Sequence, residues 1–508
     1  MSTPQGADAG RDGSTPPIRT VAGTGVAGSA GDNEAAVSAQ LNRPYGIAVD
    51  GTGTLYFADY SGHRVRKITT DGVISTVAGT GAAGFKGDGG PAVSAQLNCP
   101  REVAVDRAGA VYVADSSNHR IRKITTDGKI SAVAGTGVAG FRGDGGPADA
   151  AQLNLPLGVA VDSTGVLYIA DYNNHRVRRI TTDGVIGTVA GTGAAGFKGD
   201  GGPAVSAQLN CPAGLAVDSA GTLHVCDYGN HRVRRMTADG VIGTVAGTGV
   251  AGFSGDDGPA VAARLNSPLG VAVDSTGVLY IADYNNHRVR RVTVEGVIGT
   301  VAGTGAAGFG GDGGPAASAQ LNGPRKVALD CVDTLYVTDH LNNRIRKLTS
   351  GKMAGRPESG TVVTWANVRS RLRMGVLRES TQDGAEIHQT LPVSRNHQRW
   401  RLVAAGQDDG DVLYRIENVR SGKVLEVVEA QERAGALVVQ RGYEGGDAHH
   451  QHWRLIPVGP VSGDPRVYEI ANRHSGLLLR VDTNACTAVR QHGAEGDHRG
   501  RQWQLLPV

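Results

Sequence analysis

The chain has 508 residues, with 51 lysines and arginines against 48 aspartates and glutamates, for a formal net charge of +3. A charge so close to balance does not call for nucleic acid or an anionic membrane as a partner. Hydrophobic residues make up 40% of the chain, enough to build folded cores, and the length allows two or three domains.

Residues 1–17 are polar and rich in Gly, Pro, Ser and Asp, which predicts a disordered tail. They lack the apolar run of a secretory signal peptide, and no stretch of the chain approaches 18 consecutive apolar residues. The odd number of cysteines, five, favours reduced thiols. We therefore expect a cytoplasmic protein with no membrane partner, while export by a route without a signal peptide stays open.

Residues 18–349 are organised by a repeat of 56 residues. The pair Leu-Asn recurs once per period, at Leu41, Leu97, Leu153, Leu209, Leu265 and Leu321. In the third copy four strand signals, joined by short turns, fall at residues 158–162, 166–170, 176–180 and 185–189. Such a four-stranded sheet cannot bury both faces alone, but sheets set radially around an axis cover one another. Six copies therefore predict a six-bladed β-propeller.

The two ends of this repeat region complement each other. The sixth copy has no fourth strand, because residues 353–358 read Met-Ala-Gly-Arg-Pro-Glu. Residues 18–22, Ile-Arg-Thr-Val-Ala, form a strand signal that belongs to no complete copy. We expect this N-terminal strand to complete the last blade, which closes the ring and removes exposed strand edges.

Two motifs recur in phase with the period. Pro-x-Gly-hydrophobic-Ala-Val-Asp comes first, and Asn-His-Arg follows at Asn118, Asn174, Asn230 and Asn286. The first copy has Gly62 in place of the Asn, and the sixth has Asn343 in place of the His. Through these motifs, residues 18–348 resemble the NHL-repeat family. The resemblance implies a propeller that binds ligands; some members bind RNA on one face, and some related propellers are lyases that hold a metal on inward His residues.

A long connection leads from each fourth strand to the next blade and carries a Gly-Asp pair, which continues as Gly-Gly in four copies, as Asp-Gly after Asp256, and as Asn-Glu in the first copy. We expect these connections to share one face of the propeller with the turns that carry His, and we take that face as the binding surface. Its candidate residues are Asp88, Asp144, Asp200, Asp256, Asp312, His63, His119, His175, His231 and His287. The Asp residues are interpreted as turn stabilisers. No cofactor is predicted, although a Ca²⁺ site at these carboxylates stays open.

The fourth copy departs from the others at His224, which replaces the usual Tyr, and at Cys226. Residues two apart on a strand share one face, so the pair is a weak candidate for a metal or thiol site. Packing of two buried side chains is the alternative. No catalytic residue is predicted.

After a linker at residues 350–361, a second repeat occupies residues 362–508. Three related segments end in Trp400, Trp453 and Trp503, and the Gln-x-Trp ending is typical of them. These copies resemble the ricin-type β-trefoil lectin family. The resemblance implies that the Trp residues are core residues and that sugar is bound by an Asp, a stacking aromatic residue and an Asn.

No copy of the second repeat keeps that full set of sugar ligands. The Asp position holds Gly375, Glu426 and Arg480, and the Asn position holds His397, His450 and Gly500. The second copy comes nearest, because a carboxylate can accept sugar hydroxyls and Tyr can stack. Its candidate carbohydrate ligands are Glu426, Gln440, Tyr443, His450 and Gln451. A protein-binding or purely structural trefoil is the alternative.

Taken together, the two repeats predict an all-β chain in which a six-bladed propeller closed by an N-terminal strand precedes a C-terminal β-trefoil. The function favoured is non-catalytic binding: a protein or small ligand on the propeller face, and a glycan or polysaccharide bound weakly by the trefoil. The first alternative is a propeller enzyme, a metal-dependent lyase or hydrolase targeted by a lectin-like domain. The second, less favoured, is RNA binding by the propeller face.

Overall fold

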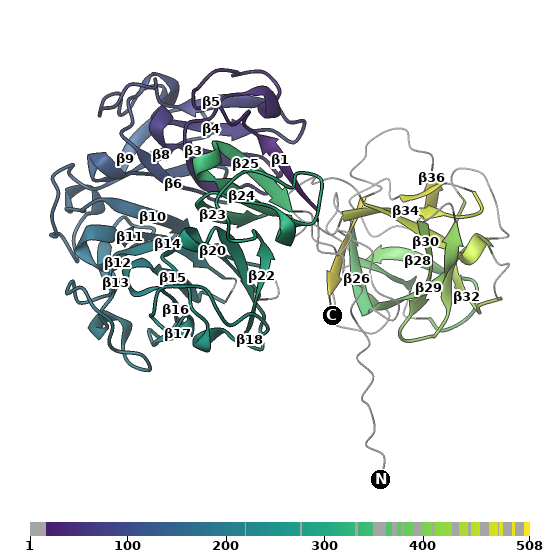
Figure 1. Ribbon diagram of the computed structural model, residues 1–508. Helices are drawn as coiled ribbons and strands as arrows, with labels where there is room; N and C mark the ends of the chain where they lie inside the picture. Colours follow the sequence, from purple (N-terminus) through teal and green to yellow (C-terminus); the bar gives the residue numbers. More distant parts are fainter. Residues whose placement is uncertain are drawn as a thin grey trace, which may run out of the picture. The chain divides into compact units, whose positions relative to one another are not determined.

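The computed structural model divides into two compact units, residues 1–351 and 352–508 (Figure 1). The predicted tail, apart from Pro17, and the predicted linker lie outside the described residues, as do Cys331 and Cys486. The structure describes residues 17–218, 220–274, 277–330, 334–348, 362–367, 373–377, 380–390, 398–408, 411–428, 436–444, 449–457, 467–475, 477–480, 490–492 and 502–507. Among these residues, no helix is both long enough and apolar enough to cross a membrane.

The first unit is a β-propeller whose described residues form six blades, each built on a four-stranded antiparallel sheet (Figure 1). The inner strands are β2 (Pro44–Val49), β6 (Pro100–Val105), β10 (Pro156–Val161), β14 (Pro212–Val217), β19 (Pro268–Val273) and β23 (Pro324–Leu329). The second strands are β3 (Leu55–Asp59), β7 (Val111–Asp115), β11 (Leu167–Asp171), β15 (Leu223–Asp227), β20 (Leu279–Asp283) and β24 (Leu335–Asp339). The blades are numbered one to six in this order.

The outer half of each blade follows the same pattern. The third strands are β4 (Arg64–Ile68), β8 (Arg120–Ile124), β12 (Arg176–Ile180), β16 (Arg232–Met236), β21 (Arg288–Val292) and β25 (Arg344–Leu348). The outer strands are β5 (Ile74–Ala78), β9 (Ile130–Ala134), β13 (Ile186–Ala190), β17 (Ile242–Ala246), β22 (Val297–Ala302) and β1 (Ile18–Ala22). In blade five the two-residue strand β18 (Gly258–Pro259) also pairs with β22.

The N-terminal strand β1 closes the ring, as the sequence predicts. It pairs antiparallel with β25 of blade six, with Ile18 opposite Leu348 and Thr20 opposite Arg346. Around the axis the inner strands of neighbouring blades lie side by side, and β2 lies next to both β6 and β23. The ring therefore leaves no blade without a neighbour on either side.

Short 3₁₀ helices of three residues occupy two places in each repeat. One set follows the second strand: η2 (Tyr60–Gly62), η4 (Ser116–Asn118), η6 (Tyr172–Asn174), η8 (Tyr228–Asn230), η10 (Tyr284–Asn286) and η12 (His340–Asn342). The other lies in the long connection: η1 (Ala36–Ser38), η3 (Ala92–Ser94), η5 (Ala148–Ala150), η7 (Ala204–Ser206), η9 (Ala260–Ala262) and η11 (Ala316–Ser318). The Asn at the end of a first-set helix donates to a connection, as Asn118 Nδ2 does to Gly84 O at 2.8 Å. Turns and connections therefore share one face.

The blades are held together by small aliphatic cores at their interfaces. One such cluster joins Ala170 and Val177 of blade three to Leu215 and Val225 of blade four, all buried. Alternate residues of each strand point to opposite faces of its sheet, so a strand can contribute to the cores on both sides. This explains how a propeller with few aromatic residues remains well packed.

The second unit is a β-trefoil. A closed barrel is formed by β26 (Val362–Asn367), β29 (Trp400–Asp408), β30 (Asp411–Asn418), β33 (Trp453–Pro457), β34 (Val467–Asn472) and β37 (Gln502–Pro507). Three further pairs are β27 (Arg373–Val376) with β28 (Ala385–Thr390), β31 (Val424–Val427) with β32 (Val438–Arg441), and β35 (Leu478–Arg480) with β36 (Arg490–His492). The 3₁₀ helix η16 (His449–Gln451) precedes β33. Six barrel strands with three hairpins define this fold.

The trefoil core confirms the core role predicted for Trp400 and Trp453, while the side chain of Trp503 lies outside the described residues. Trp365, Trp400 and Trp453 are fully buried in one cluster. The indole N–H of Trp400 donates to Met374 O, and that of Trp453 donates to Leu425 O, each at 3.0 Å. The same contact thus recurs in two of the three copies, and these rings are not exposed platforms for sugar.

Candidate functional site

The Asp residues of the long connections each hold an arginine of the third strand. Asp88 Oδ1 lies 2.6 Å from Nη2 of Arg122, and Nη1 of the same guanidinium lies 3.5 Å from Asp115 Oδ2. Arg122 is completely buried, and Gln96 O accepts a further hydrogen bond from its Nη1 at 2.7 Å. The same pairs join Asp144 to Arg178, Asp200 to Arg234, Asp256 to Arg290 and Asp312 to Arg346.

Each third strand thus buries one arginine between two carboxylates, as Arg122 is buried between Asp88 and Asp115. A buried guanidinium is tolerated because the two Asp side chains and a backbone carbonyl satisfy it. In the first copy Asp32 holds Arg66 in the same way, at 2.7 Å.

The His residues of the face link each blade to the next. His119 has a left-handed backbone (φ +52°), and its Nδ1 accepts the N–H of Leu155 from the following blade at 3.0 Å. His63, His175, His231 and His287 repeat this contact with Cys99, Cys211, Ser267 and Gly323. Burial lowers the pKa of His119, and the charge of Arg120 lowers it further. These side chains are therefore spread around the ring, each as a neutral acceptor.

His224 and Cys226 both lie on β15, and both are buried. His224 Nε2 is 3.7 Å from Asp218 Oδ2, and burial lowers the pKa of this His despite the carboxylate. Cys226 belongs to an aliphatic cluster, and burial raises the pKa of its thiol to about 12. Among the described residues, three side chains that could together hold a metal ion are found in the trefoil, and neither His224 nor Cys226 belongs to that group.

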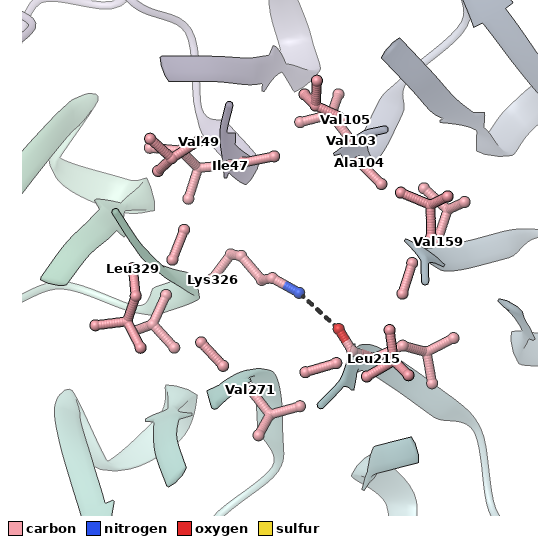
Figure 2. Close-up of a pocket in the computed structure, with 18 of the residues that line it drawn as sticks. Ile47, Val49, Val103, Ala104, Val105, Val159, Leu215, Val271, Lys326 and Leu329 are labelled. Atoms are coloured by element: carbon pink, nitrogen blue, oxygen red, sulfur yellow. Dashed lines mark hydrogen bonds between the residues drawn. The ribbon is translucent and has the colours of Figure 1, made fainter. Parts of the chain in front are cut away.

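The central channel of the propeller contains an ion pair that sequence reasoning missed. Its inner strands line a cavity of about 260 Å³. Lys326 reaches across from β23, and its ammonium donates to Leu215 O of β14 at 3.1 Å (Figure 2). The same group lies 3.2 Å from the buried carboxylate of Glu102, and burial raises the pKa of Glu102 to about 7 although Lys326 lowers it.

A departure from the repeat marks this pair. Where Glu102 and Lys326 stand, the other four blades have glycine. The inner strands approach closely there: a Cβ on Gly158 would lie 2.2 Å from Ala213 O. The residues directly before them, Arg101 and Arg325, are also charged, whereas the other four copies have no charged residue at that position. Both arginine side chains lie at the mouth of the channel, on the face that carries the turns. Comparison of the copies position by position would have found all four.

In the trefoil, four of the five candidate carbohydrate ligands come together. Glu426, which is 2% exposed, accepts a hydrogen bond from Gln451 Nε2 at 2.8 Å. His450 Nε2 lies 3.7 Å from the same carboxylate. Gln451 Oε1 accepts the N–H of Glu444 at 3.0 Å, which holds the segment that carries Tyr443 beside the site.

Tyr443 is the exposed member of this group. The residue is 36% exposed, its hydroxyl is 3.2 Å from His452 Nε2, and the guanidinium of Arg415 lies 4.5 Å from the ring centre. Gln440 is not part of the group. It is fully buried, and its amide bonds Ser421, Ser380 and Gln382 instead.

The same place could hold a cation. Glu426, Glu444 and His450 each offer a ligand atom, and these atoms all lie within 4.8 Å of one another. One His and two carboxylates suit a divalent metal. In the structure the carboxylate of Glu426 is instead bonded by Gln451 and lies 2.9 Å from Arg441 Nε.

The geometry defines a chain of two all-β modules, a six-bladed propeller and a β-trefoil. Family models agree: residues 153–180, 209–236 and 265–292 match the NHL repeat, and residues 24–86 and 82–140 match the Teneurin NHL domain. Residues 352–441 and 407–492 match the ricin-type beta-trefoil lectin domain-like model. The chain thus carries an NHL-repeat propeller and a ricin-type trefoil, an architecture of binding or scaffold proteins.

Comparisons with individual proteins give the scale of the likeness. Human teneurin-4 is 30% identical over 353 residues, which cover 62% of this chain and 12% of teneurin-4. The chain therefore spans about an eighth of that relative's length. A protein of unknown function from Bacteroides thetaiotaomicron is 21% identical with a TM-score of 0.49, over 65% of this chain and 75% of its own. The designed three-fold symmetric protein ThreeFoil is 32% identical with a TM-score of 0.26, over 29% of this chain and 99% of its own.

Proposed function

We propose that this protein is a non-catalytic binding protein whose trefoil binds a carbohydrate through Glu426, Tyr443, His450 and Gln451. The propeller face is the platform for a second ligand, a protein or a small molecule. The observation that carries the carbohydrate site is the carboxylate of Glu426, held in one orientation by Gln451 beside the exposed ring of Tyr443.

The chemistry supports weak recognition of a sugar. A carboxylate has about four acceptor positions, and Glu426 uses two of them toward Gln451 and Arg441. Arg441 is 41% exposed in its side chain, so a sugar hydroxyl can take its place without unfolding the site. Tyr443 offers an apolar ring for the sugar, but Arg415 already covers part of it. Both features predict modest affinity.

A glycan and polysaccharide array with the full chain tests the proposal. We expect binding that is lost in Glu426→Gln and in Tyr443→Ala but retained in Glu386→Gln, a carboxylate of the same trefoil that pairs with His388 at 2.9 Å. All four tryptophans of the chain lie in the second unit, so Trp fluorescence verifies that each variant trefoil is folded. Binding unaffected by the first two substitutions, or no binding to any glycan, would refute the site.

A further inference from the structure

The mouth of the propeller channel is built from two rings of side chains. The residue after the first proline of each inner strand forms one ring: Tyr45, Arg101, Leu157, Ala213, Leu269 and Arg325. The first residue of the 3₁₀ helix after each second strand forms the other: Tyr60, Ser116, Tyr172, Tyr228, Tyr284 and His340. The two rings meet between neighbouring blades, as where the Ser116 hydroxyl donates to Pro156 O at 2.6 Å.

One side of this mouth is cationic. The guanidinium of Arg325 lies 4.4 Å from the ring centre of Tyr45 and 4.5 Å from that of Tyr284, and its Nη2 donates to the Tyr284 hydroxyl at 3.2 Å. The guanidinium of Arg101 lies 5.8 Å from the ring centre of Tyr45 and 5.7 Å from that of Tyr60. Both guanidinium groups thus lie beside Tyr45, and contact with aromatic rings orients them without consuming all their N–H donors.

The opposite side of the mouth is apolar. Leu157, Ala213 and Leu269 come from three consecutive blades, and the three are buried in one cluster. Partly buried tyrosines pack against that cluster, and the ring centres of Tyr172 and Tyr228 are 6.1 Å apart. The mouth is therefore amphipathic, with a charged arc on one side and, on the other, partly buried tyrosine rings that cover a buried aliphatic layer.

The two arginines have no counter-charge within the described part of the chain. Each is half-buried, and neither forms an ion pair with a described carboxylate within 4 Å. The nearest acid in the sequence, Glu102, is 2% exposed and is neutralised by Lys326 just below the mouth. Partly desolvated guanidinium groups gain most from an oxyanion, which accepts bidentate hydrogen bonds.

We propose that this mouth binds a small amphipathic oxyanion, with a carboxylate or phosphate on Arg101 and Arg325 and a flat apolar group against the partly buried rings of Tyr172 and Tyr228. The inference rests on the proposed role of the propeller face as a ligand platform and names the chemical class of that ligand. It is independent of the carbohydrate site in the trefoil, which none of these residues contributes to.

Calorimetric titration of the full chain with three probes tests the inference. Benzoate presents a carboxylate on a phenyl ring, and phenyl phosphate presents a phosphate on a phenyl ring. Benzamide is the neutral analogue of benzoate. We expect at least one anion to bind, benzamide not to bind, and Arg101→Gln or Arg325→Gln to weaken binding at least about tenfold. Which anion binds more tightly distinguishes a carboxylate from a phosphate ligand.

The control variant is Arg235→Gln, an exposed arginine of β16 outside the mouth, which should bind like the unmodified protein. Far-UV circular dichroism verifies that each propeller variant folds. Equal binding of benzamide would overturn the anionic class while leaving a ligand platform in place. No binding of any probe, or anion binding unchanged in both mouth variants, would overturn the inference, and the glycan array would still report separately on the trefoil.

Discussion

Lys326 of blade six and Glu102 of blade two form an ion pair across the axis of the propeller, with 3.2 Å between Nζ and Oε1. Both side chains are buried, so each charge depends on the other. The pair fills a layer that glycine occupies in the other four blades. It therefore bars the channel directly below the arginines of the mouth.

Removing one partner of this pair should destabilise the propeller strongly. At pH 8 we expect Lys326→Met to cost about 3–5 kcal/mol, because it leaves the Glu102 carboxylate buried and unpaired. The cost should shrink at pH 6, since burial already raises the pKa of Glu102 to about 7 and the loss of Lys326 raises it further. Denaturant unfolding followed by far-UV circular dichroism measures both values.

The control for that variant restores the residues of the other blades. Glu102→Gly combined with Lys326→Gly removes both charges, and it should recover more than half of the lost stability at pH 8. A double variant as unstable as Lys326→Met would contradict the ion pair as the cause. Because all four Trp residues lie in the second unit, Trp fluorescence separates trefoil unfolding from that of the propeller.

Closure of the ring by β1 predicts an unusual sensitivity near the N-terminus. Ile18 is fully buried against blade six, and its backbone bonds Gly313 and Gly314 at 2.8 and 3.0 Å. Ile18→Ala should cost about 2–5 kcal/mol, as other core truncations do. The next residue, Arg19, is exposed, so Arg19→Ala should change stability by less than about 0.5 kcal/mol. Similar unfolding midpoints for both variants would show that the strand does not hold the ring.

The fold could be predicted from the sequence because every blade repeats the same pattern of strand and turn residues. In the third copy the observed strands Pro156–Val161, Leu167–Asp171 and Ile186–Ala190 differ from the predicted ranges by at most two residues at either end. The closing strand was also predictable, because the sixth copy lacks a fourth strand and residues 18–22 form a strand signal that belongs to no complete copy. Periodicity conveys this information without any knowledge of distant contacts.

The sites were harder to predict because they depend on what differs between copies. Glu102 and Lys326 meet only after the ring closes, and neither residue suggests a partner in its own repeat. A repeat average hides Arg101 and Arg325 for the same reason. In the trefoil, the resemblance brought together Glu426 and its neighbours, but Gln440 faces the interior, since it lies opposite the core residue Leu425 on the paired strand.

Asp200 tests whether the Gly-Asp connections are structural. Its Oδ1 holds the buried Arg234 at 2.6 Å, and its Oδ2 accepts the Thr244 hydroxyl at 2.6 Å. Asp200→Ala should therefore cost about 1.5–3 kcal/mol, the range for a hydrogen bond to a charged group. Because both oxygens are engaged, Ca²⁺ or a chelator should leave the unfolding midpoint of the unmodified protein unchanged. A midpoint raised by Ca²⁺ in that protein but not in Asp200→Ala would instead indicate a calcium site.

His119 predicts how the propeller responds to acid. Its Nδ1 accepts the Leu155 N–H only when the ring is neutral, and burial lowers its pKa in the folded state. Below the ordinary value of about 6.5 the unfolded chain then binds more protons than the folded one, so acid favours unfolding. The sixth copy offers the matched replacement, because Asn343 Oδ1 accepts the Arg43 N–H at 2.9 Å in the same left-handed conformation.

We therefore expect His119→Asn to keep the contact between blades and to lose less stability than the unmodified protein as the pH falls from 7 to 5. The difference should approach the value of one hydrogen bond, about 1 kcal/mol. Burial raises the pKa of Asp115 and of the equivalent Asp residues to about 6, which gives stability the opposite pH dependence, but this contribution is common to both proteins and cancels. Parallel stability curves for the two proteins across this range would exclude His119 as an acid-sensitive link between blades.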